Sequence, residues 1–401
     1  ISSDRCSSSS PYGRWRDAAV AGAAGGETAL LKPLLRQAYM GSLSLPWRMA
    51  GAIGLYSGPQ APVQFVVENA DWAIRWVGEH IRDEVNLLQP GMVQTTSQPH
   101  RVTNRVVHFG SQYMWLAWGH LLSSRNRNVT SFFHGKPEDG EDVARHIDQF
   151  LASVSRLSTV VTAASLVEER LLSWGVPREK LVRIPIGVDT RAFVPPTIEQ
   201  RQVARQRFGI PDGVVVVGSF QKDGMGWGDG MDPKLIKGPD IYIETMQAMK
   251  AAGIPVMAFL TGPARGYVKQ GLMQAGIPFV HTFAQNHFEL VACYHTLDLY
   301  VVSSREEGGP MGLMESMASS VPVVSTRVGM APDLITDGVT GGLVDDFNGV
   351  ALAKRAGQLL SLTPAELSRL KQAAECAVKV ADWSVVGRSH WELVYQHLLQ
   401  P

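Results

Sequence analysis

Two glutamates, Glu307 and Glu315, stand on either side of a glycine-rich stretch. An apolar run at 299–302 precedes this stretch, and a helix-like segment follows it. The order predicts a strand, a tight turn and the start of a helix. Backbone N–H groups and the positive end of a helix dipole would then face an anion, most naturally a phosphate. Carboxylates beside such a turn suit ribose and sugar hydroxyls, so these residues indicate a nucleotide-sugar site.

The elements that must position this site follow a repeating pattern of apolar runs and helical segments. The runs of the first half lie at about 63–68, 105–109, 129–134, 158–163 and 181–189. After a Pro-rich linker near 194–200, further runs lie at 213–219, 255–262, 278–283, 298–304 and 321–326. Such runs, separated by helices, are typical of parallel sheets covered on both faces. We therefore expect an α/β protein with two Rossmann-like, doubly wound domains, and ligands near the carboxyl ends of the strands.

Composition narrows the class of protein further. The chain has 401 residues, enough for two domains, and its 37 Lys and Arg balance 37 Asp and Glu, which gives no global field favouring nucleic acid. No apolar run reaches the ~18 residues of a spanning helix. The three cysteines (Cys6, Cys293, Cys376) are far apart, which fits a reducing compartment. We expect a cytoplasmic protein, with peripheral contact at the inner face of a membrane as an option raised by the basic clusters at 14–16 and 125–127.

The N-terminal region is harder to interpret. Its first dozen or so residues lack an initiator Met and an apolar signal core, and we interpret them as a processed, truncated or fused start. A helix is expected around 27–40, and the segment after Trp47 is predicted to be a loop. We assign 1–60 to an extension packing on the first domain. The N-terminal, acceptor-side domain is then 61–195 plus 384–401, and the C-terminal, donor domain is 196–383.

Several segments together resemble glycosyltransferase family 4, a family of retaining enzymes with the GT-B fold. The two glutamates and the following Pro-Val-Val (322–324) match its donor motif. RIPIGVDTRAF (183–193), LIKGPD (235–240) and RVGMAPDLITDGVTGGLVD (327–345) resemble further elements. The resemblance covers roughly 60–401. It implies two domains facing across a cleft, a C-terminal helix that crosses back onto the first domain, and a nucleoside-diphosphate sugar as donor.

The resemblance also implies roles for individual residues. Glu315 would accept hydrogen bonds from the nucleotide ribose, and Glu307 would contact the donor sugar. Lys237 would neutralise the diphosphate, where charge develops on the leaving oxygen. His134, at the end of the run 129–134, would approach the donor sugar across the cleft, or be satisfied by a neighbour. The turn that would hold the diphosphate or sugar hydroxyls contains Gly308, Gly309, Met311, Gly312 and Leu313.

The chain departs from the family pattern after the first strand of the second half. Gly218-Ser219 stands where Gly-Arg is usual, and the insertion QKDGMGWGDGMDPK follows. Lys222 is our candidate for the missing cation and Lys234 the alternative; a mobile surface lid with a solvated Lys222 also fits. Arg265 is expected to reach the phosphate or base, or to be a surface residue. Ser219 and Phe283 complete the donor-side candidates.

The acceptor side is less readable. The loop ENADWA (68–73) lacks the double glycine common there in the family. Asn69 and Asp71 are candidates for acceptor contacts, although Asp71 is equally a helix N-cap. His108 also ends an apolar run and is expected either to touch a substrate or to be structural. The acceptor is left open as a sugar, a glycan, a lipid-linked molecule or a small molecule.

For the mechanism, no Asp-x-Asp pair ends a strand, and we expect neither a metal nor another cofactor. We favour front-side attack by the acceptor hydroxyl, with the leaving-group oxygens accepting its proton and the donor's anomeric configuration retained. Two alternatives stay open on the same fold. One is a nucleotide-sugar epimerase or phosphorolytic enzyme, and the other is a non-catalytic nucleotide-sugar binding protein.

Overall fold

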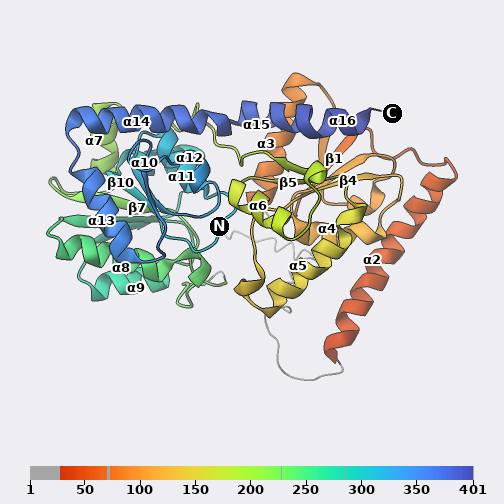
Figure 1. Cartoon of the computed structure of the whole chain (residues 1–401), viewed down its shortest axis with the longest axis horizontal. Helices are drawn as coiled ribbons and strands as arrows, with labels where there is room; N and C mark the ends of the chain where they lie inside the picture. The colour runs from red at the N-terminus through yellow and green to blue at the C-terminus, as the bar shows by residue number, and fades with distance from the viewer. Residues whose placement is uncertain (1–27, 70–72, 227, 285, 401) are drawn as a thin grey trace, which may run out of the picture.

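The computed structural model describes residues 28–69, 73–226, 228–284 and 286–400. Two α/β domains lie side by side, each built on a six-stranded sheet with helices on its faces (Figure 1). All strand pairs within the two sheets are parallel. The predicted fold class is thereby confirmed, whereas the proposed domain limits stay a prediction.

The N-terminal sheet has the strand order β2-β1-β3-β4-β5-β6. Its strands are short and mostly buried, as expected of apolar runs covered on both faces. They are β1 (Val63–Val66), β2 (Val93–Thr96), β3 (Val106–Phe109), β4 (Arg127–Ser131), β5 (Thr159–Thr162) and β6 (Leu181–Arg183). The order reverses between β1 and β3, which places the loops after these two strands at the domain's switch point.

The helices of this domain follow the predicted alternation. α3 shows the reason for its position, because Val77, Ile81 and Val85 recur at helical spacing and are its buried side. The helices are α2 (Thr28–Ala52), α3 (Ala73–Leu88), α4 (Gln112–Trp118), α5 (Glu141–Ser153) and α6 (Ser165–Ser173), with 3-10 turns at Pro99–Arg101, Gly119–Leu121, Pro137–Asp139, Val154–Arg156 and Arg178–Lys180.

The C-terminal sheet has the order β12-β11-β10-β7-β8-β9. Its strands are β7 (Val215–Ser219), β8 (Val256–Thr261), β9 (Phe279–Thr282), β10 (Leu299–Val302), β11 (Val323–Thr326) and β12 (Gly342–Val344). The order reverses between β7 and β10, so the insertion after β7 and the glycine-rich turn after β10 leave neighbouring strands at the switch point.

The helices that flank this sheet begin with α7, whose N-terminus is capped by Thr197 and Gln200 in a reciprocal capping box. They are α7 (Ile198–Arg207), α8 (Pro239–Ala251), α9 (Gly266–Gln274), α10 (His287–His295), α11 (Met311–Ala318), α12 (Ala331–Leu334), α13 (Gly349–Leu360) and α14 (Pro364–Val378), with 3-10 turns at Leu235–Lys237 and Lys379–Ala381. α8 and α13 pack on each other and on one face of the sheet.

The chain crosses between the domains twice. Its last helices, α14, α15 (Trp383–His390), a π-helical turn (Trp391–Tyr395) and α16 (Gln396–Leu399), run along one side of both domains (Figure 1). Trp383 is buried against Trp76 of α3, with ring centroids 5.2 Å apart. At the crossing point, the N–H of Val188 donates to the carbonyl of Ala381 at 2.8 Å. The C-terminal helix therefore returns to the first domain, as the family resemblance implied.

The helix α2 projects from the N-terminal domain and corrects one expectation (Figure 1). It continues to Ala52, into the segment after Trp47 that we predicted to be a loop, whereas residues 53–62 form no helix or strand, as predicted. The guanidinium of Arg125 donates to the carbonyl of Gly51 at 3.1 Å and so satisfies a helix C-terminal acceptor. This end of the helix is stabilised by a residue 74 positions away in the sequence. The local sequence, from which we predicted a loop, does not show that contact.

Candidate functional site

The candidate site is built first by the two segments that meet at the C-terminal switch point. One is the turn after β10, and the other is the 3-10 turn Leu235–Lys237 that precedes α8. The N–H groups of Arg305 and Glu306 both approach the carbonyl of Ile236, at 2.8 and 3.2 Å. Gly238 has φ +63°, and a Cβ there would lie 1.8 Å from the carbonyl oxygen of Ser303. Only glycine allows this approach, which brings Lys237 against the turn.

Lys237 and Glu307 form the central ion pair of the site. The ammonium Nζ lies 2.5 Å from Oε1 of Glu307, and Ser304 Oγ donates to the same oxygen at 3.0 Å. Burial raises the pKa of Glu307, but Lys237, His134 and the Ser304 hydroxyl together hold that pKa below its usual value. Glu307 is therefore a carboxylate that carries its charge next to a fixed cation.

His134 reaches this pair from the other domain. It lies three residues beyond the end of β4, rather than within the strand as predicted. Its neighbour Phe133 packs on the glycine-rich turn, since a Cβ on Gly308 would lie 2.6 Å from the Phe133 Cβ. Burial and then the charge of Lys237 lower the pKa of His134, against opposing effects from Glu307 and Glu306. The structure thus brings together the three residues predicted to carry the chemistry.

Glu315 lies within α11, after the glycine-rich turn that carries Glu307, and is surrounded by aromatic rings. It is buried, and the hydroxyl of Tyr294 donates to its Oε2 at 2.6 Å. Burial raises the pKa of Glu315 to about 7, and the hydrogen bond from Tyr294 opposes this rise. Tyr294 also packs against Phe220 and Tyr300, with ring centroids 4.7 and 5.6 Å away. Sequence reasoning did not find Tyr294, because its helix has no signal that links it to Glu315.

Ser219 and Arg265 meet beneath the insertion that follows β7. Arg265 donates from Nη1 to the Ser219 carbonyl at 2.6 Å and from Nη2 to Ser219 Oγ at 3.3 Å. Its Nε lies 3.0 Å from Oδ1 of Asp223, and both side chains are essentially inaccessible to solvent. Arg265 is therefore neither a surface residue nor exposed toward a phosphate. Its hydrogen bonds to the carbonyls of Ser219 and Thr261 hold it beneath the insertion, while burial raises the pKa of Asp223 against the opposing charge of Arg265.

The insertion itself is packed against the segment that begins α9. The N–H of Gly266 donates to the carbonyl of Asp229 at 2.6 Å, and the N–H of Tyr267 donates to Gly230 at 3.0 Å. Both lysine candidates on this segment, Lys222 and Lys234, are half-buried. Each has a side-chain interaction. An isolated, fully solvated Lys222 is thus not what the structure contains.

The remaining predicted residues are placed as follows. Gly308 and Leu313 are buried, whereas Gly309, Met311 and Gly312 are partly exposed. Phe283, just after β9, is 55% exposed. Asn69 is exposed, and Asp71 lies outside the described residues.

His108 corrects an expectation, because it does not reach the site. Its Nδ1 lies 2.8 Å from the hydroxyl of Tyr395 and its Nε2 lies 3.0 Å from Ser131 Oγ. The side chain is fully buried, and burial lowers its pKa well below the usual value. The C-terminal helix covers this face of the sheet, so the structural alternative holds for His108.

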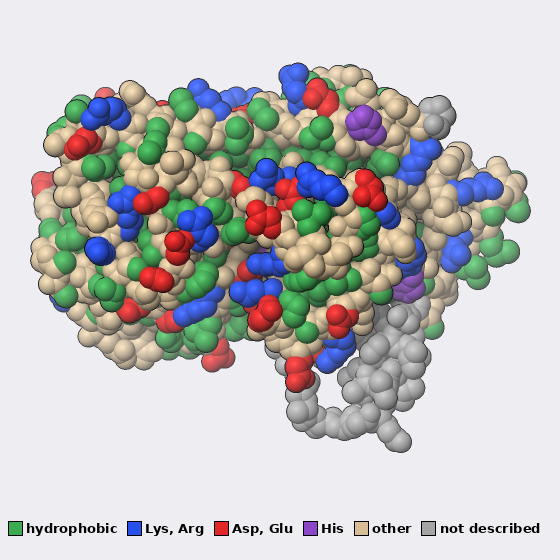
Figure 2. All heavy atoms as spheres, viewed as in Figure 1, with side chains coloured by type: hydrophobic (Ala, Val, Ile, Leu, Met, Phe, Trp, Pro, Cys, Tyr) green, Lys and Arg blue, Asp and Glu red, His purple; other side chains and the backbone are tan. Residues whose placement is uncertain are grey.

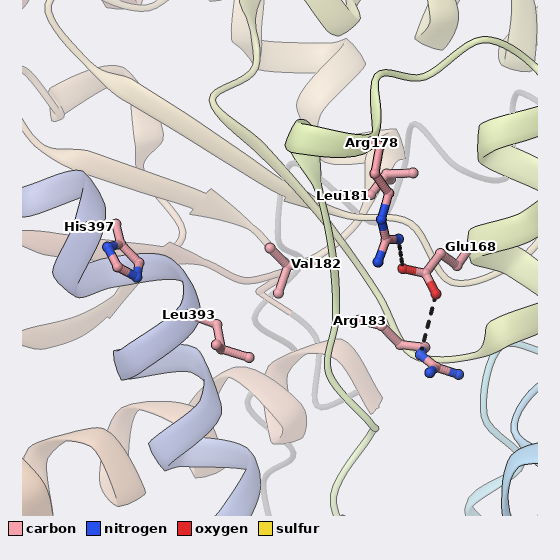
Figure 3. A pocket seen from close by; sticks show the side chains of 7 residues that line it. All are labelled: Glu168, Arg178, Leu181, Val182, Arg183, Leu393 and His397. Atoms are coloured by element: carbon pink, nitrogen blue, oxygen red, sulfur yellow. Dashed lines mark hydrogen bonds and ion pairs between the residues drawn. The ribbon is translucent and has the colours of Figure 1, made fainter.

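One pocket lies away from this site, at the outer edge of the N-terminal sheet (Figure 3). It is lined by Glu168, Arg178, Leu181, Val182, Arg183, Leu393 and His397. Glu168 forms ion pairs with Arg178 and Arg183, so one carboxylate balances one of the two guanidinium charges that line the pocket. None of the candidate donor or acceptor residues predicted from the sequence lines this pocket.

The described residues contain neither a metal-binding cluster nor a membrane-spanning helix. Within that part of the chain, no three His, Cys, Asp or Glu side chains are grouped to hold a metal ion. No helix among the same residues has the length and apolarity needed to cross a bilayer.

Comparison with known proteins agrees with the geometry. Residues 235–376 match the family model described as Glycosyl transferases group 1. Curated relatives include the lipopolysaccharide core biosynthesis mannosyltransferase LpsB of Rhizobium meliloti, 30% identical over 159 residues (38% of this chain, 42% of LpsB). The putative colanic acid biosynthesis glycosyltransferase WcaL of Salmonella typhimurium is 25% identical over 286 residues (68% of this chain, 65% of WcaL). The chain thus spans less than two thirds of the length of these two relatives.

Solved structures share the fold at lower sequence identity. The complex of Anabaena HepE with UDP-glucose superposes with a TM-score of 0.68 and 16% identity, over 83% of this chain and 99% of that one. Sucrose-phosphate synthase of Thermosynechococcus elongatus gives a TM-score of 0.67 and 15% identity, over 84% and 99%. The solved structures share the two-domain fold, and the family model and the curated relatives are those of glycosyltransferases.

Proposed function

We propose that this protein is a retaining glycosyltransferase of family 4, which moves a sugar from a nucleoside-diphosphate sugar to an acceptor hydroxyl. One observation carries the proposal: His134 lies beside the Lys237–Glu307 pair of the other domain, since its neighbour Phe133 packs on Gly308 and the N–H of its neighbour Gly135 donates to Glu306. A donor sugar held between them would touch both domains. A carboxylate, a fixed cation and an imidazole at one point suit a substrate with both hydroxyls and phosphates.

The donor half of the site would bind the nucleotide part. The N-terminus of α11 begins after Pro310 and has no side-chain cap. The N–H of Leu313 donates to the Pro310 carbonyl, so the N–H groups of Met311 and Gly312 would be the ones that face a diphosphate. Lys237 would add a positive charge on the same side. Glu315, in its ionised form, would accept hydrogen bonds from the ribose hydroxyls. Burial resists this ionisation, so bound ribose donors would lower the pKa of Glu315 from about 7.

The proposed reaction exchanges one bond at the anomeric carbon for another on the same face. The bond from this carbon to the phosphate oxygen breaks, and a bond to the acceptor oxygen forms. The acceptor's proton passes to the leaving phosphate oxygen. Lys237 and the N–H groups of the turn stabilise the charge that develops on the diphosphate, which is the usual source of much of the catalytic effect in such sites.

His134 has a role set by its protonation state. Since its pKa is lowered by burial and by Lys237, its ring is neutral near pH 7 before substrate binds. A neutral imidazole donates one hydrogen bond and accepts another. We infer that His134 orients a donor-sugar hydroxyl and excludes water, while Lys237 carries the positive charge.

The test is a panel of nucleotide sugars. UDP-glucose and GDP-mannose are suitable first donors, because one occurs in the HepE complex and the other is in the name of a GDP-mannose-dependent alpha-mannosyltransferase of Mycobacterium tuberculosis, 27% identical over 232 residues. Release of nucleoside diphosphate in the presence of acceptor sugars supports the proposal, and NMR of the product gives its anomeric configuration. An inverted configuration contradicts retention, and undiminished turnover in EDTA is expected if no metal takes part.

Donor alone provides the discriminating control. If the protein epimerises or phosphorolyses the sugar without any acceptor, then the competing enzyme classes are correct. If it binds nucleotides in calorimetry but turns over no member of the panel with any acceptor, then the binding-protein alternative is favoured.

We also propose that the projecting helix α2 docks on an anionic membrane surface, within a cytoplasmic location that stays a prediction. Met40 and Ser44 are buried against the domain, whereas Leu45 and Met49 of α2, and Ile53 directly after the helix, are exposed at a spacing of four residues. The protruding end of the molecule carries hydrophobic atoms beside basic ones (Figure 2). An apolar stripe with cations suits interfacial binding to anionic lipids.

Vesicle flotation tests this second proposal. The protein should float with vesicles that contain phosphatidylglycerol, and less with pure phosphatidylcholine. The triple substitution Leu45→Ser, Met49→Ser and Ile53→Ser should abolish flotation and leave donor hydrolysis unchanged, because these side chains are exposed and far from Lys237. Equal flotation of the variant would contradict the assignment to α2.

A further inference from the structure

Glu306 makes its main contacts across the domain interface. It belongs to the turn after β10, but Arg170 of α6 donates to both its carboxylate oxygens, from Nη1 to Oε1 at 2.6 Å and from Nη2 to Oε2 at 3.1 Å. The N–H of Gly135 donates to Oε1 at 3.2 Å, and Arg170 Nη1 also donates to the Gly135 carbonyl at 3.1 Å. Three residues from two domains thus form a closed set of hydrogen bonds, which we term the Arg170–Glu306 clasp.

The clasp is largely withdrawn from solvent. The side chain of Glu306 is 6% exposed and that of Arg170 is 20% exposed. A bidentate, charge-assisted pair in such surroundings has defined geometry as well as strength. Removing Arg170 would leave the buried carboxylate of Glu306 with the more distant ammonium of Lys136, 4.0 Å from Oε2, as its cationic partner. This contact therefore differs from the exposed ion pairs of the surface, which contribute little.

The sequence neighbours of the clasp are the residues of the proposed active site. Glu306 precedes Glu307, and Gly135 follows His134. On the donor side, Glu306 is tied through its N–H to the carbonyl of Ile236, next to Lys237. On the other side, both backbone polar groups of Gly135 are held by the clasp. Its geometry sets the position of His134 relative to the Lys237–Glu307 pair.

A second ion pair crosses the same interface at the other end of α6. Asp333 of α12 accepts from the N–H of Ser165 at 2.9 Å and from Nη1 of Arg183 at 2.9 Å. The side chains of Arg183 and Asp333 are 44% and 21% exposed, and neither residue adjoins His134 or Glu307 in the sequence. This pair gives a control that weakens the interface without touching the clasp.

We propose that Arg170 and Glu306 are positioning residues, which hold the two domains so that His134 meets the donor sugar at the Lys237–Glu307 pair. The proposal rests on the proposed glycosyltransferase function. Neither side chain is assigned a contact with substrate or a proton to transfer. Both act by fixing a geometry for which a displacement of about 1 Å can change turnover about 100-fold.

The main experiment compares Glu306→Gln with Asp333→Asn in the full chain. The probes are UDP-glucose and GDP-mannose for turnover, and UDP and GDP for calorimetric binding. For Glu306→Gln we expect kcat to fall about 10- to 100-fold, with the dissociation constant for the nucleoside diphosphate changed less than about 3-fold. Asp333→Asn should leave both kcat and the dissociation constant within about 3-fold of the wild-type values. Arg170→Lys keeps the charge but not the bidentate contact, so its kcat should lie between that of the wild type and that of Glu306→Gln.

A readout independent of activity comes from X-ray scattering. The radius of gyration of Glu306→Gln should exceed that of the wild type and of Asp333→Asn, because the domains separate when the clasp is lost. Thermal unfolding shows whether each variant is folded. An unchanged radius of gyration together with an unchanged kcat would overturn the proposal, and so would an equal loss in Asp333→Asn.

The two proposals can fail separately. If the wild type turns over no nucleotide sugar, then the glycosyltransferase function fails, while the scattering comparison still decides whether the clasp holds the domains. If the wild type is active and Glu306→Gln equals it in kcat, then only the clasp proposal is wrong. If the variant loses nucleotide affinity as much as turnover, then Glu306 shapes the binding site rather than the domain arrangement.

Discussion

The ammonium of Lys237 lies 2.5 Å from a carboxylate oxygen of Glu307, although 70 residues separate them in the sequence. The contact fixes the cation and the carboxylate relative to each other at the switch point. Such preorganisation places charge where a leaving diphosphate would need it without a further rearrangement.

Lys237→Met should lower donor turnover about 100- to 1,000-fold, because charge stabilisation at the leaving group is lost. It also leaves the buried Glu307 carboxylate without its cation, so the variant should be less stable than the wild type. The double variant Lys237→Met/Glu307→Gln removes that unpaired charge and should regain stability without regaining turnover. Urea unfolding and nucleotide release measure the two effects. Recovery of turnover in the double variant would contradict the assigned role of Lys237.

The cation that replaces the missing arginine can be identified by binding. If Lys222 faces the diphosphate, Lys222→Met should weaken UDP and GDP binding about 10-fold, as expected for the loss of one charge-assisted contact. Lys234→Met serves as the matched comparison from the same insertion and should change the affinity less than about 3-fold. Isothermal calorimetry at fixed salt gives both values. The reverse order would assign the role to Lys234.

Glu315 should make stability depend on pH. Its pKa is about 7 in the folded protein against 4.5 in the unfolded chain, so the folded state retains a proton that the unfolded state has released between these values. Stability therefore falls as the pH rises through this interval, by about 3 kcal/mol in all. Glu315→Gln removes this pH dependence. The free energy of unfolding of the variant, taken relative to that of the wild type, should therefore be higher at pH 8 than at pH 5. Urea unfolding at both values measures the difference.

Glu307 provides the control of opposite sign. Its folded pKa is held below the ordinary value, so its ionised form stabilises the protein above pH 4.5, and this contribution is lost as the pH falls through the folded pKa. The wild type should therefore lose its advantage over Glu307→Gln in acid, not in base. The same pH trend for both glutamine variants would contradict the two environments described for these carboxyls.

Gly238→Ala should disturb the site through the backbone. A Cβ there would lie 1.8 Å from the Ser303 carbonyl oxygen, so the turn Leu235–Lys237 must move away from Glu307. Gly213→Ala is the matched control, since its φ is +76° with no atom within 4 Å of the added Cβ. Gly213→Ala should lower the free energy of unfolding by about 1 kcal/mol from left-handed strain alone. Gly238→Ala should lower it by more, and should also lower turnover. Equal effects would mean that the close contact is unimportant.

The sequence was informative where the signal is local. Apolar runs such as 213–219 and 298–304 predicted the strands, and the spacing of Glu307 and Glu315 predicted a turn before a helix at the correct place. It failed where partners come from distant segments. His108 is enclosed by Tyr395, 287 residues away, and Glu306 is paired with Arg170, 136 residues away. No local pattern records such contacts, because burial is decided by how the elements pack.

Arg265 illustrates the same limit within the site. A loop arginine after a strand is ordinarily exposed. We expected Arg265 either to reach the phosphate or base or to be a surface residue, and both expectations assumed that it is exposed. The structure instead encloses it with Asp223 and Ser219 beneath the insertion. The pairing required the insertion to fold back over the strand end, which composition alone did not indicate.

The central claim is that Glu307, Lys237 and His134 form one site that consumes a nucleotide sugar. The most direct measurement is release of nucleoside diphosphate from UDP-glucose and GDP-mannose by the wild type and by Glu307→Gln, with acceptor sugars present. We predict release from one of these donors and a fall of about 100-fold or more in the variant. No release from either donor, or equal release by the variant, would contradict it.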